Sequence, residues 1–285
     1  MISHACLRPF GRLSLVAAFA VSCSFSHAGI INYDGPNPGP GGALGWLGAN
    51  VWYGEVSESN TEGTGGSDGQ TAELFGAPTG ITGNAIDLDP QSFEASSTDG
   101  GFDITDGQFN FVVMGMGGSI IDSLTILERG DTTLGGIPIN DNTFTTVVAN
   151  VFIDVIEVDG APVTTTTNLP TQQLVFTPSG GDYKLLEDGG GAPFFTTDWD
   201  GAGTFDIGAL TAAELSKRGE TFERGATKIR VALNNILTAN SVDGTSSIIK
   251  KKDGDISVIT EIPEPASAGL LFAGLVAAGC LRRRR

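Results

Sequence analysis

The chain has 285 residues, and 33 acidic side chains against 16 basic ones give it a net charge of −17. This balance excludes nucleic acid and anionic lipid as partners of the folded part, because phosphate binding requires clusters of Lys and Arg. Gly is frequent, at 41 residues, which indicates many tight turns and few long helices.

All Cys and His residues lie near the two ends of the chain, at positions 4, 6, 23, 27 and 280. A polypeptide that loses both ends has no thiol and no imidazole. This excludes disulfides, thiolate nucleophiles, Ser-His-Asp catalysis and zinc sites built on His or Cys. The folded part must then be held by its own core, which about 235 residues can supply.

Residues 1–28 have the three parts of a secretory signal peptide. Two arginines form a basic start, residues 13–21 are an apolar centre too short to span a bilayer, and Ser26-His27-Ala28 is a small-x-small cleavage site. We expect cleavage after Ala28. The alternatives are a lipoprotein signal ending at Cys23 and an N-terminal core helix.

Residues 29–261 are expected to form one domain with a Gly/Pro-rich N-terminal segment. The Pro and Gly residues of 32–42 exclude a regular element there, and 57–72 is a polar, Gly-rich loop. Beyond this loop, short stretches with alternating or β-branched apolar residues predict strands. These are 102–104, 109–113, 120–127, 143–158, 174–176, 183–186, 204–207, 229–233, 248–249 and 256–262.

Turns are predicted between these strands at five sites where Gly adjoins Asp. These sites are 106–107, 129–131, 159–160, 243–244 and 253–254. With turns at the last two sites, the final three stretches predict an antiparallel meander. A single helix is predicted over 210–218, with a capping box formed by Thr211 and Glu214 and a stop at Gly219.

Eight to ten strands with one short helix predict an all-β fold: a single β-sandwich of jelly-roll type, flanked by the apolar helices of the two terminal segments. Loops such as 57–72 would then lie at the ends of the sandwich.

The C-terminal end, residues 262–285, combines three elements in order. Pro263-Glu264-Pro265 is followed by sixteen mostly apolar residues, 266–281, and then by Arg282, Arg283, Arg284 and Arg285. A helix of that length reaches about 24 Å, which is less than the hydrocarbon core of a bilayer. The four arginines would stay in the cytoplasm and stop translocation. A weak span with a strong stop indicates a temporary anchor.

This tripartite segment closely resembles the PEP-CTERM sorting signal, with Ile262 in place of the commoner Val before the motif. The resemblance covers less than a tenth of the chain. It implies an exported protein that an exosortase-type enzyme processes, transiently anchored in the inner membrane by the C-terminal helix. It also implies a destination at the surface or in the extracellular polysaccharide of a Gram-negative bacterium. The resemblance does not point to any particular activity. A plain tail anchor is the alternative.

No cofactor is expected, but Asp-rich loops make Ca²⁺ the candidate metal, because this ion takes six to eight oxygen ligands. The candidate ligands are Asp87, Asp89, Asp99 and Asp103. The competing interpretation is that Asp-Gly pairs are turn residues.

Carboxylate pairs such as Glu94–Asp103 and Glu157–Asp159 are the remaining candidates for catalysis, of the kind a glycoside hydrolase uses. Trp46, Trp52, Tyr53 and Trp199 could stack on sugars if exposed, although a place in the core is the commoner role. The run 250–252 of three lysines is interpreted as protection of an edge strand.

We therefore expect an exported, non-catalytic surface or extracellular-matrix protein. The alternatives are a carbohydrate-binding β-sandwich module and a carboxylate-based, polysaccharide-active enzyme.

Overall fold

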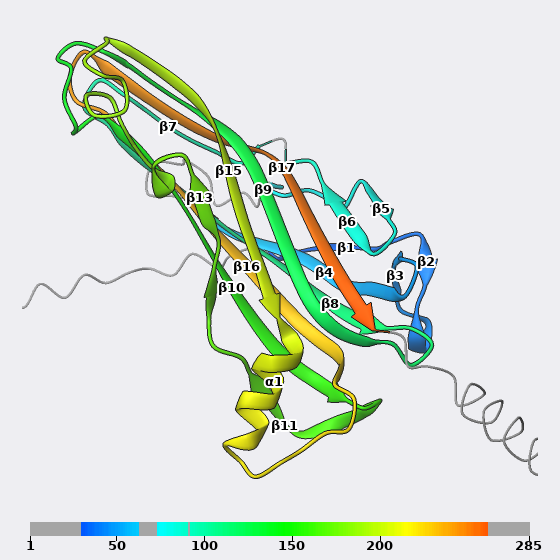
Figure 1. Cartoon of the computed structure of the whole chain (residues 1–285). Coiled ribbons are helices and arrows are strands. Elements are labelled where there is room, and N and C mark those ends of the chain that lie inside the picture. Colours follow the sequence, from blue (N-terminus) through cyan, green and yellow to red (C-terminus); the bar gives the residue numbers. More distant parts are fainter. Residues whose placement is uncertain (1–29, 63–72, 91, 262–285) are drawn as a thin grey trace, which may run out of the picture.

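The structure, a computed structural model, describes residues 30–62, 73–90 and 92–261. The expected signal peptide and sorting segment, with their apolar helices, lie outside these residues. Within the described residues, two antiparallel sheets pack face to face with a single α-helix at one end, which confirms the all-β sandwich (Figure 1).

The larger sheet has ten strands, in the order β11-β10-β16-β8-β4-β3-β2, and β1, β12 and β14 add to its margins. Its strands are β1 (Ile30–Tyr33), β2 (Asn37–Pro38), β3 (Leu44–Leu47), β4 (Val51–Glu62), β8 (Phe102–Gly115), β10 (Phe144–Val158), β11 (Ala161–Asn168), β12 (Gln172–Gln173), β14 (Asp182–Lys184) and β16 (Ala226–Asn240).

The smaller sheet has seven strands, in the order β13-β15-β9-β17-β6-β5, with β7 also paired to β17. Its strands are β5 (Gly80–Thr82), β6 (Ala85–Leu88), β7 (Glu94–Thr98), β9 (Ile120–Gly136), β13 (Val175–Thr177), β15 (Phe194–Asp206) and β17 (Thr245–Glu261). The 3₁₀ turns η1 (Pro40–Gly42) and η2 (Ser179–Gly181) complete the regular structure of the described residues.

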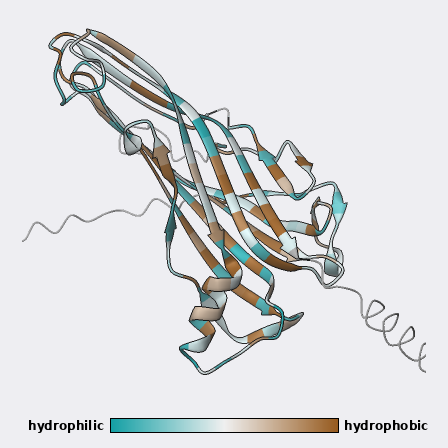
Figure 2. Cartoon of the chain, in the orientation of Figure 1, coloured by the Kyte–Doolittle hydropathy of each residue, from teal (hydrophilic) through white to brown (hydrophobic). Residues whose placement is uncertain are grey.

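The long strands alternate between the sheets along the chain: β8, β9 and β10 do so, and then β15, β16 and β17. This is the connection pattern of a jelly roll. The core lies between the sheets and is filled by alternate residues of each strand, so apolar and polar positions alternate along the ribbons (Figure 2). On β16, for example, Ile229, Val231 and Leu233 are buried.

Three predicted turns are wrong, because β8, β9 and β17 each run straight through their Gly-Asp sites. In two of them the glycine makes room for neighbouring atoms. A Cβ at Gly130 would lie 1.9 Å from the backbone oxygen of Lys250 and 2.3 Å from the Trp199 ring. At Gly107 it would lie 2.8 Å from Leu74. Glycine here permits close packing instead of a turn.

The predicted C-terminal meander is also wrong. Its first stretch lies on β16 in the larger sheet, whereas the other two belong to one continuous strand, β17, in the smaller sheet. The turn at 243–244 carries the chain from one sheet to the other. A strand that faces the core has the same alternating pattern in either sheet, so the pattern alone does not assign its partner.

The helix, α1 (Ile207–Ser216), begins three residues before its predicted start. Asp206 caps it, because its carboxylate accepts a hydrogen bond from the backbone N–H of Ala209 at 2.7 Å. The predicted capping box is therefore wrong, and Thr211 is buried within the helix. The predicted loop 57–72 is wrong over residues 57–62, because β4 extends to Glu62, and the rest of the predicted loop lies outside the described residues.

Candidate functional site

The four aspartates considered for calcium are held by separate local contacts. The Asp87 carboxylate accepts a hydrogen bond from the Thr79 hydroxyl at 2.8 Å, and the Asp103 carboxylate accepts one from the Ser96 N–H at 2.8 Å. Asp99 accepts from the Gly244 N–H at 3.3 Å, and Asp89 lines a hollow beside 250–252. Among the described residues, no group of three or more His, Cys, Asp or Glu side chains gathers to hold a metal.

The first carboxylate pair considered for catalysis is occupied by other contacts. Glu94 forms an ion pair with Lys250, whose Nζ lies 2.6 Å from a carboxylate oxygen. Its expected partner Asp103 accepts the backbone N–H described above.

The second pair has a structural role at the turn after β10. Asp159 has a positive φ of 54°, and its carboxylate accepts hydrogen bonds from the backbone N–H groups of Glu223, Arg224 and Gly225 at 2.7, 2.8 and 3.0 Å. These contacts fix the loop that leads into β16. Glu157 faces Lys228, at 3.9 Å.

The aromatic residues considered for sugar stacking are all buried. The exposed fractions of Trp46, Trp52, Tyr53 and Trp199 are 5%, 3%, 0% and 1%. Trp46, Tyr53 and Trp199 belong to the core between the sheets, whereas Trp52 is buried on the other face of β4, against Gly39, Gly45 and Gly54.

The outer face of the larger sheet carries a row of polar side chains at right angles to its strands. Strand register places Gln173, Asn150, Asn234, Gln108 and Ser59 side by side on β12, β10, β16, β8 and β4. We call these five residues the amide row. The Gln173 side chain donates to Asn150 at 2.9 Å, and Asn234 donates to Asp106 at 2.8 Å. Exposed Phe152 and Val148 flank the row on β10.

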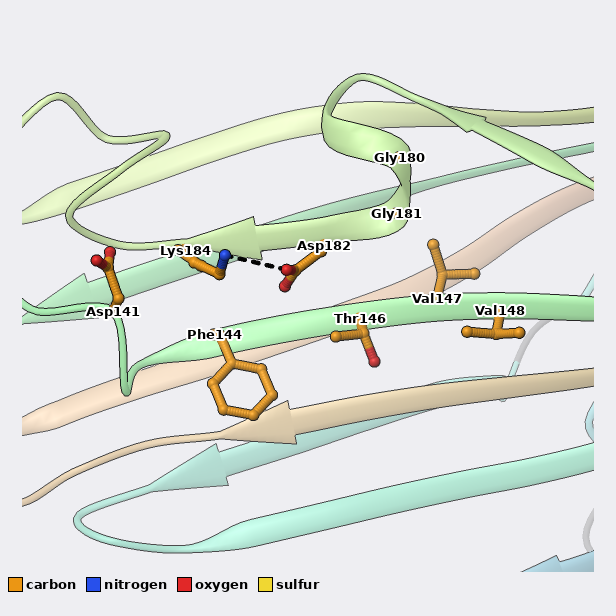
Figure 3. A pocket seen from close by; sticks show the side chains of 9 residues that line it. All are labelled: Asp141, Phe144, Thr146, Val147, Val148, Gly180, Gly181, Asp182 and Lys184. Atoms are coloured by element: carbon orange, nitrogen blue, oxygen red, sulfur yellow. Dashed lines mark ion pairs between the residues drawn. The ribbon is translucent and has the colours of Figure 1, made fainter.

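A groove of about 510 Å³ adjoins this row, where β14 and η2 lie beside β10 (Figure 3). Lys184 is the cationic side chain of its lining, and it is paired with Asp182 at 3.1 Å and Glu187 at 3.3 Å. Hydrogen bonds to these carboxylates raise the pKa of Lys184. The ammonium therefore stays charged and is unsuited to act as a base. The groove lining comprises Asp141, Phe144, Thr146, Val147, Val148, Gly180, Gly181, Asp182 and Lys184.

A second polar cluster lies inside the core, and no sequence motif connects its members. Glu128 on β9, Asn235 on β16 and Lys251 on β17 have exposed fractions of 1%, 0% and 2%. The Lys251 Nζ lies 2.6 Å from Glu128 Oε1 and 3.0 Å from Asn235 Oδ1. Asn235 Nδ2 donates to Glu128 Oε2 at 2.7 Å. We call these three residues the core triad.

Each member of the triad faces a glycine on a neighbouring strand of its own sheet. Asn235 is opposite Gly107, Lys251 is opposite Gly130, and Glu128 lies between Gly201 and Gly254. The missing side chains leave space for the long polar ones. Phe75 and Phe93 close the space, with Lys251 Nζ 4.5 Å and 5.8 Å from their ring centroids.

The lysine run is therefore not edge protection, because β17 is an interior strand between β9 on one side and β6 and β7 on the other. Lys250 and Lys252 point outward to Glu94 and Asp131, and Lys251 points into the core. Burial lowers the pKa of Lys251, and the neighbouring Glu128 carboxylate opposes that shift.

β17 ends at Glu261, and comparison with known families assigns the C-terminal segment that begins there. The family described as PEP-CTERM protein-sorting motif matches residues 261–285. The chain carries a PEP-CTERM sorting motif. It is thus an exported, exosortase-processed protein, as the resemblance implied. In the part of the chain that the structure describes, no helix is both long enough and apolar enough to cross a bilayer.

No curated protein matches the sequence of this chain. Similar solved structures include TmCBM61 in complex with beta-1,4-galactotriose, which is 7% identical over 62% of this chain and 70% of that one, with a TM-score of 0.20. A family 29 carbohydrate-binding module is 14% identical over 81% of this chain and 88% of its own, with a TM-score of 0.17. These likenesses are too distant to carry any functional argument.

Proposed function

We propose that this PEP-CTERM protein is a non-catalytic component of the cell surface or extracellular matrix, released there after an exosortase-type enzyme processes its C-terminal segment. The observation that carries the proposal is the sorting motif, which begins at the last residue of β17. Before processing, the segment 266–281 anchors the chain in the inner membrane while the sandwich folds outside.

A structural role fits the chemistry of the body. Residues 29–261 contain no His or Cys. The carboxylates considered for catalysis instead hold backbone N–H groups or lysines. These contacts leave them without the free, facing pair that a glycosidase needs.

The C-terminal mass of the mature protein tests the proposal. In the native host, the wild-type chain should lose the arginine cluster, whereas replacement of Pro263, Glu264 and Pro265 by Ala should block processing and leave the sandwich folded. Deletion of residues 282–285 should release unprocessed protein, because nothing then stops translocation.

The chain offers a matched control in a second Pro-x-Pro sequence, Pro36-Asn37-Pro38, whose prolines are exposed. Replacing these three residues by Ala should leave processing unchanged. If wild type and the sorting-motif variant both keep residues 266–285, the segment is an ordinary anchor and the proposal is wrong.

The amide row supports carbohydrate binding as a second candidate function. Amide groups provide both donors and acceptors for sugar hydroxyls, and exposed Phe152 offers an apolar face beside them. The acidic body favours a neutral polymer. Asn150→Ala should weaken retention on the host's neutral extracellular polysaccharide by about tenfold, whereas Thr125→Ala on the outer face of the other sheet should not. Equal retention of both variants would contradict this function.

A further inference from the structure

The core triad places an amine, a carboxamide and a carboxylate in mutual contact, sealed from water between the two sheets. The Lys251 nitrogen approaches the side-chain carbonyl of Asn235 at 3.0 Å, while one carboxylate, Glu128, touches both partners, at 2.6 and 2.7 Å. We propose that Lys251 and Asn235 condense into an intramolecular amide, an isopeptide bond, with Glu128 carrying the protons and ammonia as the leaving group.

The reaction needs no external reagent. The Lys251 ammonium gives one proton to the Glu128 carboxylate, and the neutral amine attacks the Asn235 side-chain carbonyl carbon to form the C–N bond. A second proton from the attacking nitrogen passes through Glu128 to the asparagine nitrogen. The bond between Cγ and Nδ2 then breaks and ammonia leaves. The products are a secondary amide, a protonated Glu128 and one molecule of ammonia.

The surroundings favour each part of this step. Desolvation lowers the pKa of Lys251, which increases the fraction of neutral, nucleophilic amine. The fold holds nucleophile and carbonyl together, so that no translational entropy is lost at the moment of reaction. Condensation also replaces a buried ion pair, which is costly to desolvate, by neutral groups.

A surface hollow of about 300 Å³ lies beside Lys251. It is lined by Asp89, Pro90, Phe93, Glu94, Lys250, Lys251 and Lys252. The ammonia would leave toward this hollow, past the Phe93 ring, which lines the hollow and also lies beside Lys251 Nζ.

The bond would connect the two sheets, because Asn235 belongs to β16 in the larger sheet and Lys251 to β17 in the smaller one. The two residues are 16 positions apart in the sequence. The link would close this short loop and clamp the strand that precedes the sorting motif. A body without cysteines would thus gain a covalent staple that no reductant opens.

Peptide mapping of the mature protein from the native host tests the proposal. After denaturation and trypsin digestion, the link should join residues 231–250 to residues 251–252 in one branched peptide, with a mass about 17 Da below the sum of its parts because one ammonia is lost. Recovery of residues 231–250 unlinked from wild type would overturn the proposal and leave the triad as a non-covalent ion-pair network.

Variants identify the participants. Glu128→Gln preserves the volume but cannot accept the lysine proton, so its folded protein should lack the branched peptide. Lys252→Arg, a control at the neighbouring outward position that keeps the trypsin site, should retain the branched peptide. Asn235→Asp should give a branched peptide of the same mass as wild type, because water leaves instead of ammonia. A branched peptide in folded Glu128→Gln would contradict the proton-carrying role of Glu128.

Discussion

Glu58 tests how much stability one buried carboxylate contributes to this sandwich. It lies on β4 with 1% of its surface exposed, and it accepts hydrogen bonds from the backbone N–H groups of Leu74, Phe75 and Gly76 at 2.7, 2.9 and 3.0 Å. One oxygen serves Leu74 and the other serves Phe75 and Gly76. The carboxylate thereby holds Leu74 and Phe75 in the core.

Glu58→Gln has almost the same shape but only one acceptor oxygen. In the best orientation two hydrogen bonds survive as neutral ones, each about 1 kcal/mol weaker, and the third N–H faces an amide NH₂ at a cost of about 1–3 kcal/mol. We expect the free energy of unfolding to fall by about 3–5 kcal/mol. Hydrogen exchange at the N–H groups of residues 74–76 should accelerate in parallel.

Urea unfolding followed by tryptophan fluorescence measures the difference. Glu55→Gln is the control, because Glu55 is an exposed residue on the same strand and its replacement should change stability by less than about 0.5 kcal/mol. If Glu58→Gln unfolds within about 1 kcal/mol of wild type, the carboxylate is not the anchor of residues 74–76 and the reasoning fails.

Two further predictions concern Gly130 and Asp159. Gly130→Ala should destabilise the protein by at least about 2 kcal/mol in urea unfolding, because the added methyl group meets backbone and ring atoms. The control Gly80→Ala should be nearly neutral, because its added methyl group meets nothing within 4 Å. Equal effects of the two substitutions would contradict the packing role of Gly130. For Asp159, burial raises the pKa, but hydrogen bonds from residues 223–225 and the charge of Arg224 outweigh burial and lower it. Its contribution is therefore present above the ordinary carboxyl pKa of about 4 and is lost as the pH falls through the lower folded value. The difference in unfolding free energy between wild type and Asp159→Asn should accordingly shrink below about pH 4, and a constant difference from pH 3 to 7 would refute this.

The fold class could be predicted because the inward positions of most long strands are apolar. Residues 143–158 and 229–233 show this alternation clearly, and both lie on strands of the sandwich. Strand partners could not be predicted, since the same alternation suits either sheet. The sorting segment is recognisable because its three elements are contiguous.

The core triad is beyond sequence reasoning for a different reason. Lys251 and Glu128 are 123 residues apart, and each sits in a polar stretch that looks solvated. The pattern around glycines 107, 130 and 254 predicts turns, although each of these glycines lies in mid-strand opposite a triad member. Glycine inside a long alternating stretch is the signal that could have indicated a mid-strand position instead of a turn.

The position of β17 has a mechanical consequence. The strand ends where the sorting motif begins, and it is hydrogen-bonded on both sides, to β9 and to β6 and β7. Hydrogen bonds of antiparallel strands lie perpendicular to the strand axis, so tension applied along β17 loads many of them together in shear. Tension applied to an edge strand such as β13 would instead break its hydrogen bonds to the neighbouring strand one after another. A protein held by its C-terminal end therefore transmits drag from the surrounding medium into one of the best-supported strands of its smaller sheet.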